Sequence, residues 1–554
     1  MNTSAPLFPN GFPTSGLTRR RFLQTTVGIL SVAVLGALTP ARAADGGTFD
    51  IVVIGGTPGG IAAAIAAARL GRSVALTEYH PHFGGMSASG LGKSDIENRD
   101  VVRGLFAEFV GRVEQHYRDR YGADSEDYRL CRDGYFYEPK VAERVFNEML
   151  AEQKSISLFS NHQFVGVEKS GESVTTATVR DRASGALHRL DGKIFIDATY
   201  EGDLYAAAGA EFRLGREPRD EFGEPHAGHV YFDHRNVKFL PGGTGAGDRR
   251  LTAYTYRLCL TDDPANAHRL TSPPPEYDRR VYLGYLDDVR SGRFGNDVIT
   301  ARVPFTIARI PNRKTDVNMK PVPLGFVFVE ENAGYVDADW TDRERISRRI
   351  RNLTLGLLWF LQNDPDIPAA HREYANTLHL PLDEFTDNGH FPFQLYVREA
   401  RRLVGEYTLT EHDVTKAGGR GRTGRHDDAI AVGEFPIDSF PYRKKQPGDT
   451  VILEGYLGML RSLTRLYQIP YRIMVPKKVD GLLVPVAAST THVAFSTIRM
   501  EPTWMVLGQA AGVAAHVALE KSVPPRAVPI SEVQALLRRQ GQVIDLPDRE
   551  SADP

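Results

Sequence analysis

The stretch Phe49-Asp50-Ile51-Val52-Val53-Ile54-Gly55-Gly56-Thr57-Pro58-Gly59-Gly60, followed by Ile61-Ala62-Ala63-Ala64-Ile65-Ala66-Ala67-Ala68-Arg69-Leu70-Gly71, decides the fold. Its apolar run lacks polar alternation and therefore predicts a strand buried on both faces. The glycines predict a tight turn, and the alanines predict a helix that packs closely on the strand. Strand, glycine turn and helix in this order are typical of the phosphate-binding start of a Rossmann βαβ unit.

A second strand and an acidic residue extend this unit. Val74-Ala75-Leu76-Thr77 predicts the strand, which ends at Glu78. Glu78 follows the turn by about 20 residues, where such units place an acid against a ribose hydroxyl. The helix N-terminus offers free N–H groups and a positive dipole end to a pyrophosphate. We therefore predict dinucleotide binding, and the alternative is a purely structural βαβ unit. The predicted binding residues of this unit are Gly55, Thr57, Pro58, Gly59, Gly60 and Glu78.

Thr57 departs from the usual glycine pattern. In the spacing G-x-G-x-x-G, the middle glycine falls at Thr57. The backbone can still approach a phosphate if the Thr57 side chain turns away, and its hydroxyl is able to donate a hydrogen bond.

The N-terminus has the features of a targeting segment. Thr18-Arg19-Arg20-Arg21-Phe22-Leu23-Gln24 resembles a twin-arginine export signal. An apolar stretch from Val27 to Leu38 follows, and Ala41-Arg42-Ala43 fits a cleavage site. The apolar stretch is short and broken by glycine, so no stable membrane span is expected after cleavage. We expect a periplasmic or secreted protein; the alternative is an uncleaved anchor.

Charge and cysteine content exclude several classes of function. The chain has 67 basic and 69 acidic residues, so no nucleic-acid partner is implied. Cys131 and Cys259 form no C-x-x-C motif, which argues against a dithiol reductase and against zinc or iron–sulfur sites built from cysteine. No metal site is expected.

The predicted fold class is α/β, with a Rossmann-type domain of parallel sheet plus a small antiparallel meander, and an inserted α+β substrate domain. Helices are expected over 101–118 and 139–154, meander strands over 157–160, 163–169, 175–181 and 187–190, and a buried strand over 193–199. The glycine clusters at 242–247 and 418–425 are interpreted as loops, which leaves no second dinucleotide unit. Near the C-terminus we expect a strand within 480–486, a polar loop over 489–499 and a helix from about Pro502 to Glu520.

The chain is long enough for two or three domains after removal of the signal. The predicted divisions are a signal peptide over 1–43, a first part of the cofactor domain over 48–215, a substrate or cap domain over 216–477, a second part of the cofactor domain over 478–525 and a C-terminal tail over 526–554.

Several motifs in order resemble the FAD-dependent oxidoreductase family, within the group that includes fumarate reductase flavoprotein subunits. The matching segments are Gly55–Gly60 with Glu78, Gly84-Gly85-Met86 with Ser89-Gly90-Leu91, Ile196-Asp197-Ala198-Thr199 with Gly202-Asp203, Tyr396–Arg402, Tyr467–Arg472, Ser489–His492, and Arg499-Met500-Glu501-Pro502 with Gly508-Gln509. The resemblance spans nearly the whole chain after the signal and implies FAD as the cofactor.

The resemblance also implies a layout for FAD. Glu78 would hold the adenosine ribose, and the backbone near Phe164 would meet the adenine. Gly84, Gly85 and Met86 would line the pyrophosphate and the flavin edge, and Gly202 and Asp203 would hold the ribityl side. Ser89, Ala198 and Thr199, which belong to the same motifs, are further predicted cofactor-binding residues. The helix that begins at Pro502 and Thr503 would direct its N–H groups toward the flavin N1–C2 carbonyl, where a positive dipole end favours the reduced form.

The candidate catalytic residues are His492, Arg499, Arg398, Arg402 and Tyr471. An imidazole near its reference pKa makes His492 the candidate general base; the alternative is a structural histidine. Arg499 is a candidate for binding a substrate carboxylate or hydroxyl, or else for pairing with Glu501 or another acid. Arg398 and Arg402 are four apart, so on a helix they would share one face and one site, unless that face carries salt bridges. Tyr471 is a weaker candidate, and the sequence does not place His426 and Asp438.

These features predict an exported enzyme that oxidises a small polar organic substrate, an alcohol, a sugar-like molecule or an amine, by hydride transfer to flavin N5. Oxygen, a quinone or a soluble carrier remains open as the electron acceptor. One alternative is reduction of an activated double bond, with an arginine as the proton donor. The other is a non-enzymatic flavin electron carrier or binding protein.

Overall fold

The computed structural model describes residues 46–233, 236, 238–291, 304–321, 324–415, 423–446 and 453–547. The predicted signal over 1–43 and most of the glycine cluster at 418–425 lie outside the described residues. In the described part of the chain, no helix is both long enough and apolar enough to cross a membrane.

A parallel sheet forms around the first predicted strand. β1 (Gly47–Ile54) lies between β2 (Val74–Thr77) and β6 (Leu187–Asp197) and is parallel to both, with Ile51 opposite Val74 and Ile194. β3 (Ile156–Phe159) extends the sheet beyond β2, and β18 (Leu482–Leu483) pairs with β6. Because parallel strands share the direction of their ends, the turns after β1, β2 and β6 meet at one edge of the sheet.

The predicted antiparallel meander is present. β4 (His162–Ser170) and β5 (Ser173–Asp181) pair with each other, and β5 pairs with the first half of β6. The sheet order over the described residues is β3-β2-β1-β6-β5-β4. Two details of the prediction were wrong. Segment 157–160 belongs to the parallel part of the sheet, and segments 187–190 and 193–199 belong to one strand, because β6 pairs with β5 by its first half and with β18 by its second.

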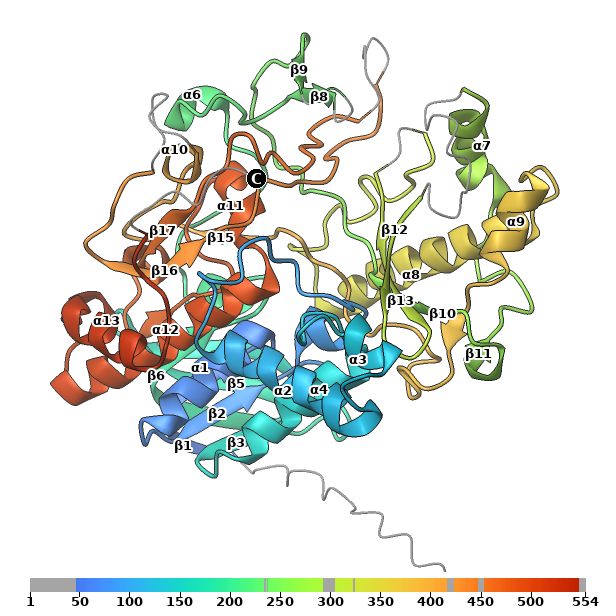
Figure 1. Ribbon diagram of the computed structural model, residues 1–554. Helices are drawn as coiled ribbons and strands as arrows, with labels where there is room; N and C mark the ends of the chain where they lie inside the picture. The colour runs from blue at the N-terminus through green and yellow to red at the C-terminus, as the bar shows by residue number, and fades with distance from the viewer. Residues whose placement is uncertain are drawn as a thin grey trace, which may run out of the picture. The chain divides into compact units, whose positions relative to one another are not determined.

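The two ends of the described chain meet at a helix pair. α1 (Pro58–Arg69) lies beside α12 (Glu501–Lys521), drawn blue and red in Figure 1. A Cβ on Gly508 would lie 1.9 Å from the carbonyl oxygen of Gly59, and a Cβ on Gly512 would lie 2.3 Å from that of Ala63. The bare helix face that the sequence predicted is therefore the contact surface between these helices. α13 (Ile530–Arg539), within the predicted tail, packs on α12.

The predicted helices before the meander are confirmed as α2 (Leu105–Tyr121) and α4 (Pro139–Ala151). Two expectations about local structure were wrong. The stretch 489–499 contains a short helix, α11 (His492–Ile498), which Thr491 caps through its side chain. The backbone from Arg398 to Arg402 is not helical, and Arg402 begins the two-residue strand β15 (Arg402–Leu403).

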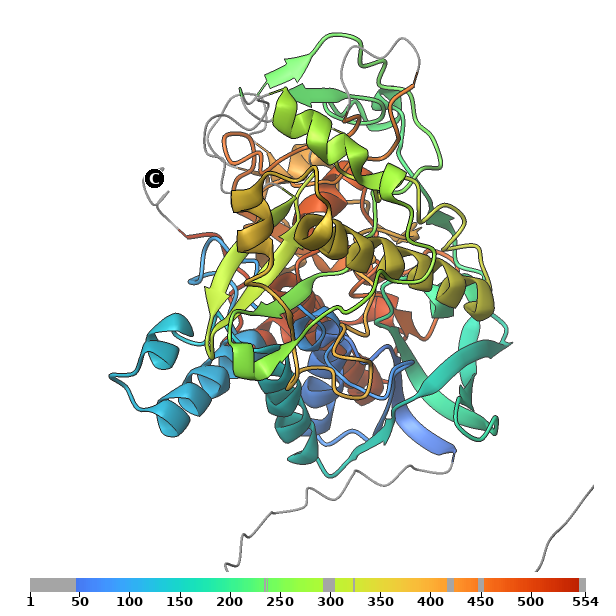
Figure 2. The same ribbon diagram turned by 90° about the vertical axis from the view of Figure 1, so that its right-hand side faces the viewer.

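Residues between 216 and 477 mix short strands with helices. A three-stranded antiparallel sheet of order β10-β13-β12 and the long helix α8 (Trp340–Asn363) are its main elements, and Figure 2 looks onto α8. Asp339 caps α8 by accepting from the Asp342 N–H, and Ile346, Ile350 and Leu353 are buried along one face. Residues 43–554 form one compact unit, and the division at 215/216 and 477/478 stays a prediction.

The other helices of the described residues are α3 (Glu126–Leu130), α5 (Asp203–Ala207), α6 (Arg219–Phe222), α7 (Leu283–Arg290), α9 (Ala369–Ala375) and α10 (Glu411–Val414). The other strands are β7 (Phe212–Arg213), β8 (Tyr231–Asp233), β9 (Lys238–Leu240), β10 (Leu258–Thr261), β11 (Ala267–His268), β12 (Phe305–Ile310), β13 (Lys314–Met319), β14 (Leu380–Pro381), β16 (Ala429–Gly433) and β17 (Tyr467–Pro470).

Candidate functional site

The glycine turn after β1 has room for backbone only. Gly55 has a φ of +106°, and a Cβ on Gly60 would lie 1.9 Å from the Gly55 carbonyl oxygen. Thr57 caps α1, since its hydroxyl accepts from the Gly60 N–H at 3.2 Å and donates to the Ala198 carbonyl at 2.9 Å. The side chain of Thr57 is thus held between α1 and the end of β6, while Pro58 and Gly59 form the first turn of α1.

A cavity of about 410 Å³ opens at the carboxyl edge of the parallel sheet. Such a volume lies within the range of small-molecule and cofactor sites. The predicted cofactor residues that line it are Gly55, Thr57, Glu78, Phe164, Thr199 and Asp203. The others surround the turns nearby without lining it. The opposite wall, which the sequence did not reveal, comes from α8.

Glu78 is a buried acid at the end of β2. Its two carboxylate oxygens accept from the Gly56 N–H at 2.7 Å and from the His80 N–H at 2.9 Å. Burial raises the pKa of Glu78 to about 7, and these two backbone hydrogen bonds act in the opposite direction. A carboxyl group has acceptor capacity beyond two hydrogen bonds, so a ribose hydroxyl can still be bound here.

The turn after β6 holds the next predicted residues. Thr199 Oγ1 donates to Asp197 at 2.7 Å and accepts from the Gly202 N–H at 2.9 Å. Arg343 of α8 donates two hydrogen bonds to the Asp203 carboxylate, at 2.5 and 2.8 Å, and Arg401 donates a third at 2.9 Å. The Asp203 carboxylate therefore ties α5 to α8, and its ribityl role stays a prediction.

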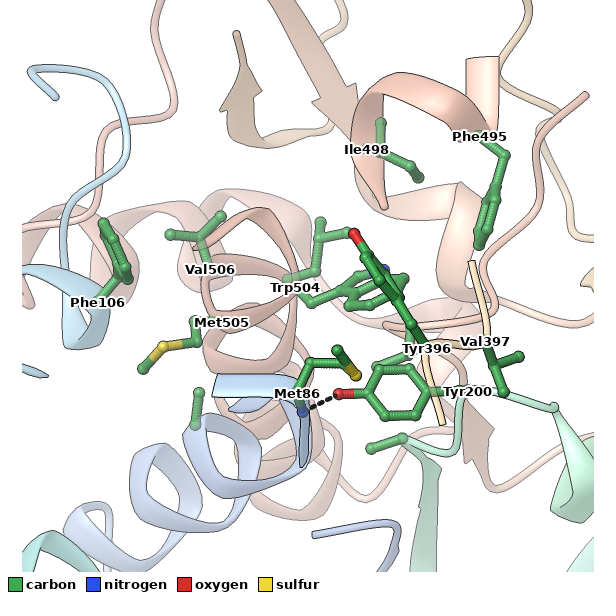
Figure 3. Packing of buried hydrophobic residues seen from close by; sticks show 14 of the residues in the cluster. Met86, Phe106, Tyr200, Tyr396, Val397, Phe495, Ile498, Trp504, Met505 and Val506 are labelled. Atoms are coloured by element: carbon green, nitrogen blue, oxygen red, sulfur yellow. Dashed lines mark hydrogen bonds between the residues drawn. The ribbon is translucent and has the colours of Figure 1, made fainter. Parts of the chain in front are cut away.

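Tyr200 joins the Gly84–Met86 loop to the start of α12 (Figure 3). The Met86 N–H donates to the Tyr200 hydroxyl at 3.0 Å, and that hydroxyl donates to Glu501 at 2.7 Å. A Cβ on Gly85 would lie 2.3 Å from the same hydroxyl oxygen. The structure thus brings the predicted loop residues close to the N-terminus of α12, where Pro502 and Thr503 lie. Tyr200 also lines the cavity.

Ser89 has a different contact from the rest of this loop. Its hydroxyl accepts from the Gln394 N–H at 2.8 Å, and Gln394 lines the cavity. Ser89 therefore connects the loop to the segment that leads into the arginine cluster described next.

Arg398 and Arg499 both contact Tyr396. Arg398 donates to the Ala253 carbonyl at 3.0 Å and to Thr255 Oγ1 at 2.9 Å, and its guanidinium lies 4.1 Å from the centre of the Tyr396 ring. Arg499 donates to the Tyr396 hydroxyl at 3.1 Å. Tyr200 packs against Trp504, with ring centroids 5.3 Å apart, and Figure 3 shows both together with Tyr396. The predicted meeting of Arg398 with Arg402 was wrong, because the helix on which it rested does not form.

Arg398 is a buried cation without a counter-ion among the described residues. Its side chain is 1% exposed, its Nε atom has no hydrogen-bond partner, and its acceptors are neutral. Burial lowers the pKa of Arg398 to about 9, and the neighbouring Arg499 and Arg257 act in the same direction. The group is still protonated at neutral pH.

Sequence reasoning missed Arg257 and Asp95 in this cluster. Arg257 is buried and pairs with both oxygens of Asp316, at 2.8 and 2.7 Å, while its Nη1 lies 3.5 Å from Asp95. Burial opposes ionisation of Asp95, but Arg257 and Lys93 hold its pKa below the ordinary value. The available signal was a charged residue directly before the apolar run Leu258-Cys259-Leu260.

Asp438 joins the cluster through Arg499. Arg499 donates to the Asp438 carbonyl at 2.7 Å and lies 3.4 Å from its carboxylate, so Asp438 rather than Glu501 is its acidic partner. Burial raises the pKa of Asp438, and Arg499 opposes the shift. Arg257, Arg398, Arg499, Asp95, Asp438 and Tyr396 are called the arginine cluster below.

His492 and Arg402 belong to a separate buried network. The Glu217 carboxylate accepts from the Arg402 guanidinium at 2.7 Å and from the backbone N–H of His492 at 2.9 Å. The His492 Nε2 atom accepts from the Gly228 N–H at 3.0 Å, which uses its lone pair. Burial lowers the pKa of His492 to about 3, so the expectation of an imidazole near its reference pKa is wrong.

The remaining candidates lie apart from the arginine cluster. The Tyr471 hydroxyl is buried and donates to the Pro525 carbonyl at 2.8 Å, and burial raises its pKa. His426 lies 3.9 Å from Asp413 and packs against Tyr407. Tyr471 therefore has a structural contact at the start of the C-terminal segment.

A comparison with protein families matches residues 50–537 to the family described as FAD dependent oxidoreductase. The chain belongs to the FAD dependent oxidoreductase family. A flavoenzyme of this family uses FAD as its cofactor, so the predicted cofactor and enzyme class are confirmed. The predicted α/β class is confirmed by the parallel sheet and its antiparallel meander.

Individual relatives of this FAD dependent oxidoreductase are distant. The tRNA uridine 5-carboxymethylaminomethyl modification enzyme MnmG of Dichelobacter nodosus (strain VCS1703A) is 26% identical over 239 residues, which cover 39% of this chain and 37% of that protein. The chain thus matches little more than a third of the length of this curated relative.

Among solved structures, the myxobacterial chondrochloren halogenase CndH is 14% identical, with 89% of this chain and 79% of that chain covered and a TM-score of 0.35. The glycerol-3-phosphate dehydrogenase of Bacillus halodurans, complexed with FAD, is 15% identical, with 35% and 44% covered and a TM-score of 0.22.

The residues of this FAD dependent oxidoreductase fit its cofactor. The turn at Gly55 and Gly60 leaves no space for side chains, and the positive dipole end of α1 lies beside the cavity-lining residues Gly55 and Thr57. At the start of α12, the buried Glu501 Oε2 and Trp504 Nε1 atoms have no hydrogen-bond partner in the described residues. Both observations favour a polar ligand that extends from the cavity past Tyr200.

Proposed function

We propose that this FAD dependent oxidoreductase oxidises a small polar organic substrate, an alcohol, a sugar-like molecule or an amine, at the arginine cluster. FAD supplies the hydride acceptor at its N5 atom when bound. The observation that carries the proposal is Arg398, a buried cation with neutral acceptors and an unused Nε donor. A substrate oxygen or carboxylate beside Arg398 would supply the acceptor that the protein does not.

The neighbours of Arg398 suggest distinct roles in this oxidation. Arg499, fixed by the Tyr396 hydroxyl and by Asp438, is placed to orient a second polar group of the substrate. Asp438 is the candidate proton acceptor, since burial raises its pKa toward the range of a useful base. The rings of Tyr396 and Phe440 flank Arg398 at 4.1 and 3.7 Å and keep water away from the charge.

A second candidate function is reduction of an activated double bond. The lowered pKa of Arg398 favours it, because a buried arginine that loses its proton more readily is a better proton donor. The MnmG relative is named for tRNA modification, but the formal charge of −2 gives no support for a nucleic-acid substrate here.

Anaerobic titration of the yellow holoprotein tests these alternatives. Bleaching of the flavin bands by alcohols, sugars or amines supports oxidation. Reoxidation of dithionite-reduced protein by enoates supports reduction. Indifference to both, with fast electron exchange with protein partners, supports a carrier and contradicts the proposal.

The Arg398→Met variant tests the site itself. We expect flavin reduction by the substrate to slow by about a hundredfold or more, because a charged hydrogen-bond donor to the substrate is lost. The exposed Arg345→Met variant serves as the control. An unchanged rate of flavin reduction in Arg398→Met would show that Arg398 does not bind the substrate.

We further propose that the protein is exported to the periplasm or secreted through its twin-arginine segment, and passes electrons to oxygen, a quinone or a soluble carrier. The twin-arginine route suits a protein that takes up its cofactor before export. Replacement of Arg19 and Arg20 by lysine should leave the full-length protein inside the cell. Export of this variant at the normal rate would contradict the proposal.

A further inference from the structure

One face of α8, a helix outside the βαβ unit, lines the cofactor cavity. Figure 2 looks onto this helix. The α8 residues on this wall follow the i, i+3, i+4, i+7 spacing of a single helix face. They are Trp340, Arg343, Glu344, Ser347, Arg348 and Arg351.

An aromatic pair closes the end of the cavity next to Glu78. The rings of Tyr79 and Trp340 are stacked, with centroids 3.8 Å apart, and the Arg182 guanidinium lies 4.0 Å from the Tyr79 ring. Glu344 accepts from the Tyr79 hydroxyl at 2.6 Å and from Arg182 at 2.8 Å. Glu78 occupies the ribose-binding position of the βαβ unit, so this pair lies at the adenosine end.

The arginines on this face differ in how they are neutralised. Arg343 is paired with Asp203 at 2.5 Å. Arg351 is half-buried and donates to the Asn388 carbonyl at 3.3 Å, and neither it nor Arg348 forms an ion pair with any described residue. Burial lowers the pKa of Arg351, and no carboxylate offsets the shift. Two arginines without counter-ions thus line the same cavity as Gly55 and Thr57, where α1 begins.

An anionic group in this cavity could bind at the N-terminus of α1 and, at the same time, to the arginines of α8. The N-terminus of α1 favours a phosphate, and arginine binds phosphate through its paired N–H groups. The diphosphate of a dinucleotide carries such charges next to an adenosine. Arg182 and Arg343 lie over the Tyr79 and Trp340 rings, at 4.0 and 5.0 Å, so the pair offers its ring edges, beside Glu78, to that adenosine.

We propose that α8 holds the adenosine diphosphate half of FAD in the cavity. Arg351 and Arg348 pair with the diphosphate, and Trp340, supported by Tyr79 and Glu344, contacts the adenosine. The long helix of the 216–477 region is then part of the cofactor site. The inference concerns cofactor retention and does not depend on the identity of the substrate.

The release of FAD from the purified holoprotein tests this proposal. The rate is followed by the rise in flavin fluorescence after dilution. We expect Arg351→Met and Trp340→Ala each to release FAD about tenfold faster, with a larger effect in Arg348→Met/Arg351→Met. The matched control is Arg345→Met, also on α8, whose side chain pairs with Asp342 and does not line the cavity. Its release rate should match that of the parent protein.

Conservative variants separate the proposed contacts from general damage to the fold. Arg351→Lys and Trp340→Phe should release FAD at rates between the parent and the truncations. Added salt should accelerate FAD release from the parent protein more than from Arg348→Met/Arg351→Met, because the charge pairs are screened. Unchanged release in Arg351→Met and Trp340→Ala would overturn the proposal.

One outcome would assign the arginines to the substrate. In that case FAD release stays unchanged in Arg351→Met while the substrate concentration for half-maximal flavin reduction rises. A holoprotein that retains FAD through α8 but is bleached by no alcohol, sugar or amine would defeat the proposed oxidation and leave this inference standing.

Discussion

Glu501 is a buried carboxyl group that accepts a hydrogen bond from the Tyr200 hydroxyl at 2.7 Å. Burial raises its pKa to about 8, and the hydrogen bond from Tyr200 acts in the opposite direction. In the unfolded chain the same group titrates near the reference value of about 4.3. The folded protein therefore binds this proton more tightly between these two pKa values. The group lies where α12 begins, close to the Gly84–Met86 loop.

This proton linkage predicts a pH-dependent stability. The contribution of Glu501 is fully present below the unfolded pKa and is lost as the pH rises toward about 8. The free energy of unfolding of the parent apoprotein should fall as the pH rises over this range. In Glu501→Gln this fall should be smaller, by an amount on the order of a few kcal/mol. Urea unfolding at several pH values measures it. Glu520→Gln, an exposed position on the same helix, is the control, and parallel profiles for Glu501→Gln and the parent protein would contradict the assignment.

His492 shows how burial changes the role of a residue. Its Nε2 atom accepts from the Gly228 N–H, and burial lowers its pKa to about 3, so it stays neutral over the working pH range. We expect the substrate to reduce the flavin of His492→Gln at a rate within about threefold of the parent rate. His492→Ala should lower the free energy of unfolding by about 1–3 kcal/mol. Stopped-flow reduction and thermal unfolding check both. A hundredfold slower reduction in His492→Gln would restore the role of general base.

At the scale of elements, the α1–α12 contact is set by glycine. Gly508 faces the Gly59 carbonyl, and a Cβ there would lie 1.9 Å from the carbonyl oxygen. The two helices approach this closely because neither presents a side chain at the contact. The same contact positions the start of α12 relative to the phosphate-binding turn, since Gly59 lies in the first turn of α1.

We expect Gly508→Ala to lower the free energy of unfolding by at least about 1–3 kcal/mol, because the helices must separate. Gly111→Ala in α2 is a matched control, since a Cβ there meets no atom within 4 Å. That variant should gain about 0.5–1 kcal/mol from the higher helix propensity of alanine. Calorimetry of both proteins provides the measurement. Equal stability of the two variants would show that α1 and α12 are not in close contact.

At the scale of the whole molecule, Lys314 is a fully buried residue that begins β13. Its ammonium group lies 2.7 Å from Glu138, 2.8 Å from Asp383 and 2.7 Å from Glu384. Glu138 precedes α4. Burial raises the pKa of Glu384 to about 7 even with the ammonium group beside it, so the buried carboxylates depend on this cation.

Lys314→Met should lower the free energy of unfolding by about 3–5 kcal/mol, because it leaves the buried Glu384 without its ammonium partner and Glu138 with Lys140 alone. Lys320→Met, an exposed lysine just after β13, should have little effect. Chemical unfolding at pH 7 measures both, and the loss should shrink at lower pH as the carboxyl groups are protonated. A stability equal to that of Lys320→Met would mean that the three carboxyl groups are solvated rather than paired.

The sequence by itself determined the βαβ unit, Glu78, the antiparallel meander and the bare face of the C-terminal helix. Each depends on residues close together in the chain, where strand burial, glycine conformation and helix spacing act locally. The order of the motifs also predicted the family and the cofactor, and the family comparison confirms both.

Only the tertiary structure decided which charged residues share a site. Arg257, Arg398 and Arg499 come from distant segments and meet around Tyr396, whereas Arg398 and Arg402, four apart, point into different networks. Spacing failed there because no helix forms between them. The burial that neutralises His492 and the wall that α8 gives to the cavity likewise arise from long-range packing, since desolvation and pairing depend on what the folded chain places around each group.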